Sequence, residues 1–417
     1  MSDTARCRLC GGHHLSPLFS LYDLPISHYL RKGLQDPDPR FTVEFENCQA
    51  CGLLQIVDVI PADLIYAESD TYTTGFQQPK HLDDLITTTV ARQDPAKAID
   101  IGCNDGTLME ALRRSGYTQI VGVEPNPLAA ETARKKGHQV YISYLTKDLA
   151  AQIVADHGEF DTVYLRHVVE HVSELETFFA GIRALLRPDG YLVVEMPDVE
   201  EAFKLGSPAV LWEEHVSYFT PSQAEYMLES HGFHIYDRRR YVFGGGSIAF
   251  VAQKKPAPAA SAAGMLNIPE PSATIELLRR FAAGVERQKA ELNCLVSQAR
   301  SAGFQVLIYG AAPRSCLLVS VSRIAGMIDF VVDDRQDIQH RLMPGTEQLV
   351  RSLVEVAGKT GRKLLCLLGV GAENEFKVRT KIEALIEADL VFVSLFAPRD
   401  TLESVAHARC AITANQK

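Results

Sequence analysis

The stretch Lys97–Gly106, which reads KAIDIGCNDG, decides how the middle of this chain folds. Ala98–Ile101 is a short apolar run that ends in a glycine turn, and a stretch of helical periodicity opens directly after Gly106. Strand, glycine turn and helix together form a βα unit, in which a ligand approaches the backbone at the helix N-terminus. Ile120–Val123 predicts a second strand, and Glu124 at its end is placed to accept hydrogen bonds from a ribose.

The glycines of this turn do not follow the dinucleotide pattern G-x-G-x-x-G. The turn reads Asp-x-Gly-x-Asn-Asp-Gly and resembles the S-adenosylmethionine (SAM) loop of Rossmann-like methyltransferases. The alternative is a βα turn in some other α/β enzyme. The resemblance predicts SAM as cofactor, and the residues expected to bind it are Asp100, Gly102, Asn104, Asp105, Gly106, Glu124, Pro125 and Arg166.

Composition narrows the class of protein. The 417 residues are too many for one ordinary core and predict two to three domains. A net charge of -10 argues against a nucleic-acid partner, and Arg238–Arg240 is expected to be a solvated strand edge. No stretch approaches the roughly twenty apolar residues of a membrane span, and no secretory signal is visible, so we expect a cytoplasmic protein without a membrane partner.

Four of the nine cysteines form two Cys-x-x-Cys pairs, Cys7/Cys10 and Cys48/Cys51. A glycine follows each pair and allows the tight turn that points backbone N–H groups at the thiolates. Two such pairs can converge into a four-cysteine zinc site, with His13 and His14 as nearby substitutes. Because all four ligands come from protein, we assign this metal to folding. The remaining cysteines, expected to be buried thiols, are Cys103, Cys294, Cys316, Cys366 and Cys410.

The chain is predicted to be α/β, with a small N-terminal zinc-binding module, a central Rossmann-like methyltransferase domain and a second Rossmann-like domain. We place the zinc module at 1–60, the SAM domain at 61–254, a Pro/Ala-rich linker at 255–264 and the last domain at 265–417. A long amphipathic helix is expected over 272–302. Strands are expected at 41–45, 161–165, 190–195, 305–310, 328–333, 363–369 and 390–394, and 185–190 reads as helix end, turn and strand start.

Four features in one order resemble the sugar C-methyltransferase family of deoxysugar biosynthesis. They are the paired Cys-x-x-Cys motifs, the Asp-Ile-Gly-Cys-Asn-Asp-Gly loop, the segment 213–219 (Glu-Glu-His-Val-Ser-Tyr-Phe) and a second Rossmann-like half that begins Tyr-Gly-Ala-Ala at 309–312. The resemblance covers essentially the whole chain. It implies methylation of carbon 3 of a nucleotide-linked 4-keto-6-deoxysugar, which would be the small-molecule partner of this chain.

The chemistry that this family carries out gives Glu214 and His215 a role. Carbon becomes nucleophilic only when a proton is removed, and a proton beside a ketone is acidic enough for a histidine base. The resemblance therefore implies His215 as the base, with Glu214 orienting its ring or binding a sugar hydroxyl. Without the family match, a lone histidine is more often structural. The family has a tyrosine where Trp212 stands, so any hydroxyl role at that position is missing here.

Other site residues follow from the resemblance alone. His171 matches the family's histidine after the fourth strand and is expected to touch the sugar, although a helix-capping role fits equally. Tyr72 matches a tyrosine that reaches over the active site and could instead pack between domains. Phe243–Ser247 resembles the family's His-Gly-Gly-Ser turn, with Phe in place of His, or makes a plain hairpin bend.

In the C-terminal half the match weakens, since Ile338 and His340 stand where the family has Lys and Gly. These changes put the usual thymidine diphosphate carrier in doubt, although Arg314 or Arg335 could pair a pyrophosphate. A purely structural role for this half remains open. Two alternatives to the main interpretation also stay open: an O- or N-methyltransferase on a sugar or related small molecule, and a binding protein whose zinc and Rossmann-like modules mediate contacts without turnover. The oligomeric state is not predicted.

Overall fold

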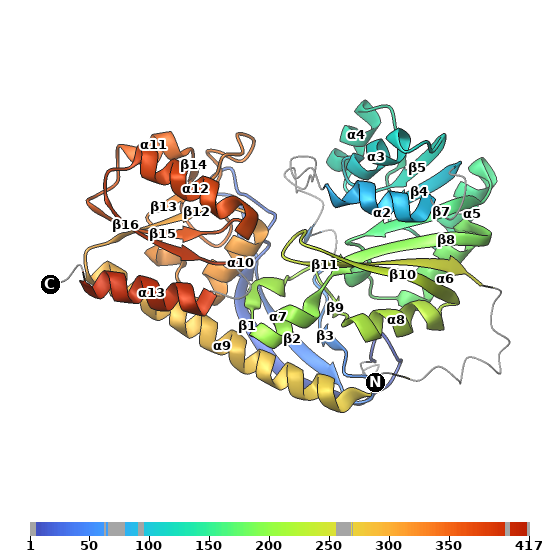
Figure 1. The fold of residues 1–417 in the computed structure, drawn as a ribbon, viewed down its shortest axis with the longest axis horizontal. Helices are drawn as coiled ribbons and strands as arrows, with labels where there is room; N and C mark the ends of the chain where they lie inside the picture. The colour runs from blue at the N-terminus through green and yellow to red at the C-terminus, as the bar shows by residue number, and fades with distance from the viewer. Residues whose placement is uncertain are drawn as a thin grey trace. The chain divides into compact units, whose positions relative to one another are not determined.

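A computed structural model describes residues 6–61, 64–65, 80–90, 96–255, 268, 270–396 and 401–414 (Figure 1). Tyr72 lies outside these residues, as does the predicted linker apart from Lys255. The chain packs as two compact units, and each is described by itself. The first unit comprises Met1–Pro17, Phe45–Glu200 and Glu214–Glu276; the second comprises Leu18–Glu44, Glu201–Glu213 and Leu277–Lys417. The domain limits given above are limits along the sequence and stay predictions.

A seven-stranded sheet forms the centre of the first unit, in the order β10-β11-β8-β7-β4-β5-β6. The strands from β8 to β6 are parallel, whereas β11 and β10 add an antiparallel edge. The strands are β4 (Lys97–Ile101), β5 (Gln119–Val123), β6 (Gln139–Tyr141), β7 (Phe160–Arg166), β8 (Leu186–Pro197), β10 (Phe233–Tyr241) and β11 (Ser247–Lys254). The expected Rossmann-like βα unit is therefore present, with β4, its turn and β5 in adjacent positions.

Both faces of this sheet are buried, as the continuous apolar runs of parallel strands require. Successive residues of β7 show the two faces: Val163 belongs to one hydrophobic cluster and Tyr164 to the other. The Tyr164 face packs against α2 and α3, and the Val163 face against α5, α6 and α8 (Figure 1). The helices of this unit are α2 (His81–Val90), α3 (Thr107–Arg114), α4 (Pro127–Lys135), α5 (Lys147–His157), α6 (Leu175–Leu185) and α8 (Pro221–Ser230).

Short antiparallel strands flank the second cysteine pair: Cys48 ends β2 (Arg40–Cys48), and Cys51 lies in the turn before β3 (Leu54–Ile56). Residues 45–47 of β2 pair with β3, and β3 pairs with β9 (Ser217–Tyr218). The expected strand at 41–45 is thus the first part of β2. Because β9 begins two residues after His215, its pairing with β3 anchors the segment that carries the predicted base.

A five-stranded parallel sheet in the order β14-β13-β12-β15-β16 forms the centre of the second unit. Its strands are β12 (Gln305–Tyr309), β13 (Phe330–Val332), β14 (Val350–Arg351), β15 (Lys363–Leu368) and β16 (Asp389–Ser394). Its helices are α10 (Pro313–Val321), α11 (Leu353–Ala357), α12 (Ala372–Leu385) and α13 (Thr401–Ala414). Most of the long helix α9 (Pro271–Ser301) belongs to this unit, where its Phe281 packs against Phe203 of α7 (Val199–Leu205). The strand β1 (Leu15–Pro25) begins in the first unit, and its residues from Leu18 onward belong to the second. The sheets confirm the predicted α/β class with two Rossmann-like parts.

Two sequence expectations are wrong. No separate turn follows α6, because β8 starts at Leu186 and a register shift between Phe160 and Thr162 of β7 absorbs the extra residues. Cys294 and Cys410 are exposed rather than buried, since they lie on the solvent faces of amphipathic α9 and α13. Arg238–Arg240 does lie on the edge strand β10, as expected. Within the described residues, every helix is too short or too polar to cross a lipid bilayer.

Candidate active site

The turn after β4 has the backbone shape of a ligand-binding loop. Gly102 and Gly106 have φ values of +75° and +80°, which residues with a Cβ rarely adopt. A Cβ on Gly102 would lie 2.4 Å from Val168, so this position also requires glycine for packing. Gly106 precedes α3 and has no side chain to cap it. The N–H of Thr107, the first of the helix, donates to the Asp105 carboxylate, and the N–H groups that follow can meet a ligand or water.

Glu124 closes the turn from the end of β5. Its carboxylate accepts hydrogen bonds from the backbone N–H groups of Asn104, at 2.8 Å, and Asn126, at 2.7 Å. Burial raises the pKa of Glu124, and these two bonds oppose that effect. Pro125 is half-buried between Glu124 and Asn126, and the Asn126 side chain caps α4. The acid expected to hold a ribose therefore also fixes the loop, and each of its oxygens keeps a further lone pair.

Asp100, near the end of β4, carries a buried carboxyl group. Burial raises the pKa of Asp100 to about 7, with Arg166 opposing and Glu124 adding to the shift. A cation near Asp100 would stabilise its ionised form. SAM carries both a sulfonium and an ammonium group. It could therefore supply the positive charge that Arg166 provides only in part to Asp100. Asp105 is different, because its carboxylate accepts from the N–H and hydroxyl of Thr107 and lies 3.7 Å from Lys136.

A cluster of charges that the sequence did not predict lies where β7 and β8 end. Glu195 is fully buried and accepts hydrogen bonds from Arg166 and Ser247, each at 2.6 Å. His81 of α2 lies 2.9 Å from the same carboxylate. Burial opposes ionisation, yet Arg166, His167 and His81 hold the pKa of Glu195 well below its usual range. The signal in the sequence was a glutamate that ends an otherwise apolar strand, but nothing pointed to His81.

His171 and His215 come together, as the family motif implied. Their rings lie 4.9 Å apart between centroids and are nearly perpendicular. His171 belongs to the 3-10 turn η1 (Val169–His171), and its Nδ1 lies 3.0 Å from the backbone carbonyl of Glu214. The Glu214 carboxylate lies 3.9 Å from the same nitrogen. The predicted catalytic residues His171, Glu214 and His215 therefore lie together in one site, while Tyr72 lies outside the described residues.

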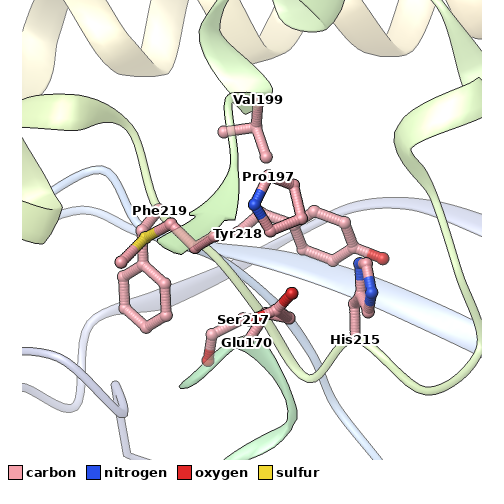
Figure 2. A pocket seen from close by; sticks show the side chains of 8 residues that line it. Glu170, Pro197, Val199, His215, Ser217, Tyr218 and Phe219 are labelled. Carbon is pink, nitrogen blue, oxygen red and sulfur yellow. The ribbon is translucent and has the colours of Figure 1, made fainter. Parts of the chain in front are cut away.

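His215 is only 7% exposed and lines a cavity of about 10 Å³, with room for about one water molecule. Figure 2 shows its ring beside Glu170 and the hydroxyl end of Tyr218. Burial lowers the pKa of His215 to about 3, and His171 adds to this effect, whereas Glu170 and Glu214 oppose it. The imidazole is therefore neutral at pH 7 and can accept a proton.

The four N-terminal cysteines converge. Cys7 and Cys51 have sulfurs 3.5 Å apart, Cys10 and Cys48 3.6 Å, and all four sulfurs lie within 4.8 Å of one another. Ligands at 2.3 Å around a tetrahedral zinc lie about 3.8 Å apart, so the set fits this metal. The backbone N–H of Ala50 points at the Cys48 sulfur, as expected for such a turn. His13 and His14 are not part of this four-cysteine cluster.

The arginines predicted to pair a pyrophosphate have partners within the second unit. The Arg335 guanidinium contacts the Asp337 carboxylate, and Arg314 lies 4.6 Å from the Phe396 ring centroid. Phe243–Ser247 forms the bend between β10 and β11, and the Phe243 ring lies beside Arg166 and His167. A contact of these residues with the substrate stays a prediction.

Comparison with known proteins agrees with this geometry. Three family models match successive parts of the chain: "Putative zinc binding domain" at residues 7–66, "Methyltransferase domain" at 76–237 and "C-methyltransferase C-terminal domain" at 243–367. The chain is thus a SAM-dependent methyltransferase with zinc and SAM as cofactors.

Curated relatives narrow this class. The chain is 28% identical to C-methyltransferase NovU of Streptomyces niveus over 369 residues, which is 84% of this chain and 86% of that protein. It belongs to the C-methyltransferase family with an N-terminal zinc-binding domain, as its motifs predicted. The mitochondrial ubiquinone biosynthesis O-methyltransferase of Bos taurus is 32% identical over 179 residues, but that match spans 36% of this chain and 46% of the relative.

Solved structures also match the chain in part. Magnesium protoporphyrin IX methyltransferase from Synechocystis PCC 6803, with bound SAM, aligns with 43% of this chain and 80% of its own at 18% identity and a TM-score of 0.32. The N-methyltransferase NodS from Bradyrhizobium japonicum aligns with 44% of this chain and 98% of its own, at 13% identity and a TM-score of 0.34.

Proposed function

We propose that this C-methyltransferase acts on a nucleotide-linked 4-keto-6-deoxysugar and methylates the carbon beside the ketone. His215 takes the proton from that carbon, and the electron pair of the broken C–H bond forms the enolate. SAM, when bound, supplies the methyl group to the enolate carbon. The proposed product carries a new carbon–carbon bond, and the proton leaves from His215 to solvent.

The observation that carries this proposal is a neutral, buried histidine, His215, which lies beside carboxylates and against His171, the residue that follows the strand next to the SAM loop. β7, which leads to His171, pairs in parallel with β4, which leads to Asp100 and the glycine turn. Carboxyl ends of neighbouring parallel strands meet at one edge, where ligands of such sheets bind. A base with room for little more than one water is suited to proton abstraction from carbon, because few solvent molecules compete.

Methyltransferases that act on oxygen or nitrogen do not need this proton removed from carbon, so the proposal has a direct test. The protein is incubated in D₂O with S-adenosylhomocysteine and each of several nucleotide-linked 4-keto sugars, and deuterium in the recovered sugar is measured by mass spectrometry. We expect incorporation of one deuterium beside the ketone with the true substrate. The matched control is the corresponding 4-hydroxy sugar, which has no acidified proton.

Incorporation no faster than in the absence of protein, across a panel in which one sugar is methylated with SAM, would contradict base-catalysed deprotonation. Methylation confined to a hydroxyl or amine would contradict the proposal as a whole. The carrier nucleotide is identified in the same panel, by comparing sugars that differ only in the base.

A further inference from the structure

Glu170 is a buried acid of the site to which no motif gave a role. It is 2% exposed, belongs to η1 and lines the same small cavity as His215 (Figure 2). Its backbone carbonyl accepts a 2.8 Å hydrogen bond from the N–H of Val216. The residue after His215 is thus joined to the residue that carries this carboxylate, and their relative position is fixed by backbone.

The Glu170 carboxylate lies close to the histidines of the site and has few other partners among the described residues. One of its oxygens, a ring nitrogen of His171 and a ring nitrogen of His215 all lie within 4.8 Å of one another. Among the described residues, neither Glu170 oxygen has a hydrogen bond of regular geometry. One of its oxygens forms an ion pair with Nδ1 of His167, at 3.4 Å. A buried carboxylate without such bonds is costly, which points to a partner that it gains during the reaction.

The charged groups around His215 indicate that the partner Glu170 gains is the protonated ring of His215. His171 and His167 disfavour a proton on His215, whereas Glu170 and Glu214 favour it. The Glu214 carboxylate approaches His171, and His167 is also 3.8 Å from Glu195, which leaves Glu170 as the acid that faces His215 from η1. Although burial opposes ionisation, the three histidines hold the pKa of Glu170 below its usual value, so it is a carboxylate at neutral pH.

We propose that Glu170 is a positioning residue that orients His215 and stabilises its imidazolium once the proton has been taken from the substrate. This inference rests on the proposed role of His215. A buried imidazolium next to His171 and His167 would otherwise be strongly disfavoured, and the rate of proton removal follows the stability of that cation. Glu170 thus acts through His215 and does not touch the substrate.

The test compares Glu170→Gln with Glu176→Gln, which makes the same charge change on an exposed side chain. We expect Glu170→Gln to lower kcat and the exchange rate by roughly ten- to a hundredfold. KM for the sugar and the Kd for SAM should change less than about twofold, because neither ligand touches Glu170. Glu170→Asp, which keeps the charge, should recover part of the lost rate, and Glu176→Gln should behave as wild type.

A double variant tests whether Glu170 works through His215. Residues that act as a unit are not additive, so Glu170→Gln/His215→Asn should be no slower than His215→Asn alone. Losses that multiply, or a Glu170→Gln variant with wild-type exchange, would overturn the inference. If His215→Asn itself exchanges like wild type, the proposed function fails instead. Should Glu170→Gln not fold, Glu170→Asp decides: loss of soluble protein or a rate equal to wild type with raised KM indicates a structural role and overturns the inference.

Discussion

Nδ1 of His171 lies 3.0 Å from the backbone carbonyl oxygen of Glu214, 43 residues along the chain. A carbonyl oxygen only accepts, so Nδ1 is the donor in this hydrogen bond. The same two segments are joined a second time by the N–H of Val216 and the carbonyl of Glu170. These two bonds place the turn after β7 and the segment before β9 in one site, although neither segment predicts the other in sequence.

The zinc site should respond to loss of one ligand. Cys48→Ser should abolish binding of the one zinc expected per chain and lower the melting temperature by roughly 10 °C or more, because a structural metal contributes directly to folding. Elemental analysis and thermal unfolding measure both effects. Cys294→Ser is the matched control, since that cysteine is exposed. Full zinc content in Cys48→Ser would show that the cysteine cluster is not the metal site.

Glu124 should support SAM binding. Glu124→Ala removes the acceptor of two backbone amides and of the expected ribose hydroxyls, so SAM should bind about ten- to a hundredfold more weakly, equivalent to roughly 1.5–3 kcal/mol. Calorimetric titration gives the affinity. Glu131→Ala on the exposed side of α4 is the control and should bind as wild type. Equal affinity in both variants would remove Glu124 from the site.

Binding of SAM should strengthen as pH rises through about 7. Burial raises the pKa of Asp100 to about 7, so the free protein carries a largely protonated Asp100 at pH 6 and a largely ionised one at pH 8. A cationic ligand favours the ionised form, and the gain over this range is at most about tenfold per pH unit. Titrations in two buffers of different ionisation enthalpy should show proton release on binding. Asp100→Asn should lose both the release and the pH dependence.

Two glycines make a packing contact in the second unit. A Cβ on Gly284 of α9 would lie 2.6 Å from the Cα of Gly206, which itself has a φ of +63°. Gly284→Ala should therefore lower the free energy of unfolding by roughly 1–3 kcal/mol, although alanine is otherwise the better helix former. Gly326→Ala has open space around the added Cβ and is the control. Denaturant unfolding in which both variants match wild type would contradict the contact.

Local signals explain what could be predicted from the sequence. The turn after β4 needs glycine at fixed positions, and a zinc site needs cysteines at fixed spacing within each pair. Both features can therefore be recognised from short stretches of sequence. Strands such as β7 and β15 were recognisable because burial on both faces requires continuous apolar runs. The family motif added His171, Glu214 and His215, whose clustering the structure then showed.

The rest depends on contacts between distant residues. His81, Glu195 and Ser247 come from a helix and two strands that meet only after the sheet forms, and no short pattern links them. Glu170 stands next to His171 in the motif, but its place beside His215 follows from the fold of η1. Sequence likewise failed at Cys294, where the helical position decides exposure more than the residue type.

The exchange rate of the variant His215→Asn shows whether His215 removes the proton. Deuterium incorporation beside the ketone is measured in D₂O with saturating S-adenosylhomocysteine, alongside methyl transfer with SAM and the Kd for SAM. We expect exchange and turnover to fall together by roughly a hundred- to ten-thousandfold while SAM affinity stays within about twofold. Exchange at the wild-type rate in a variant that no longer transfers methyl groups would contradict it, because another group would then take the proton.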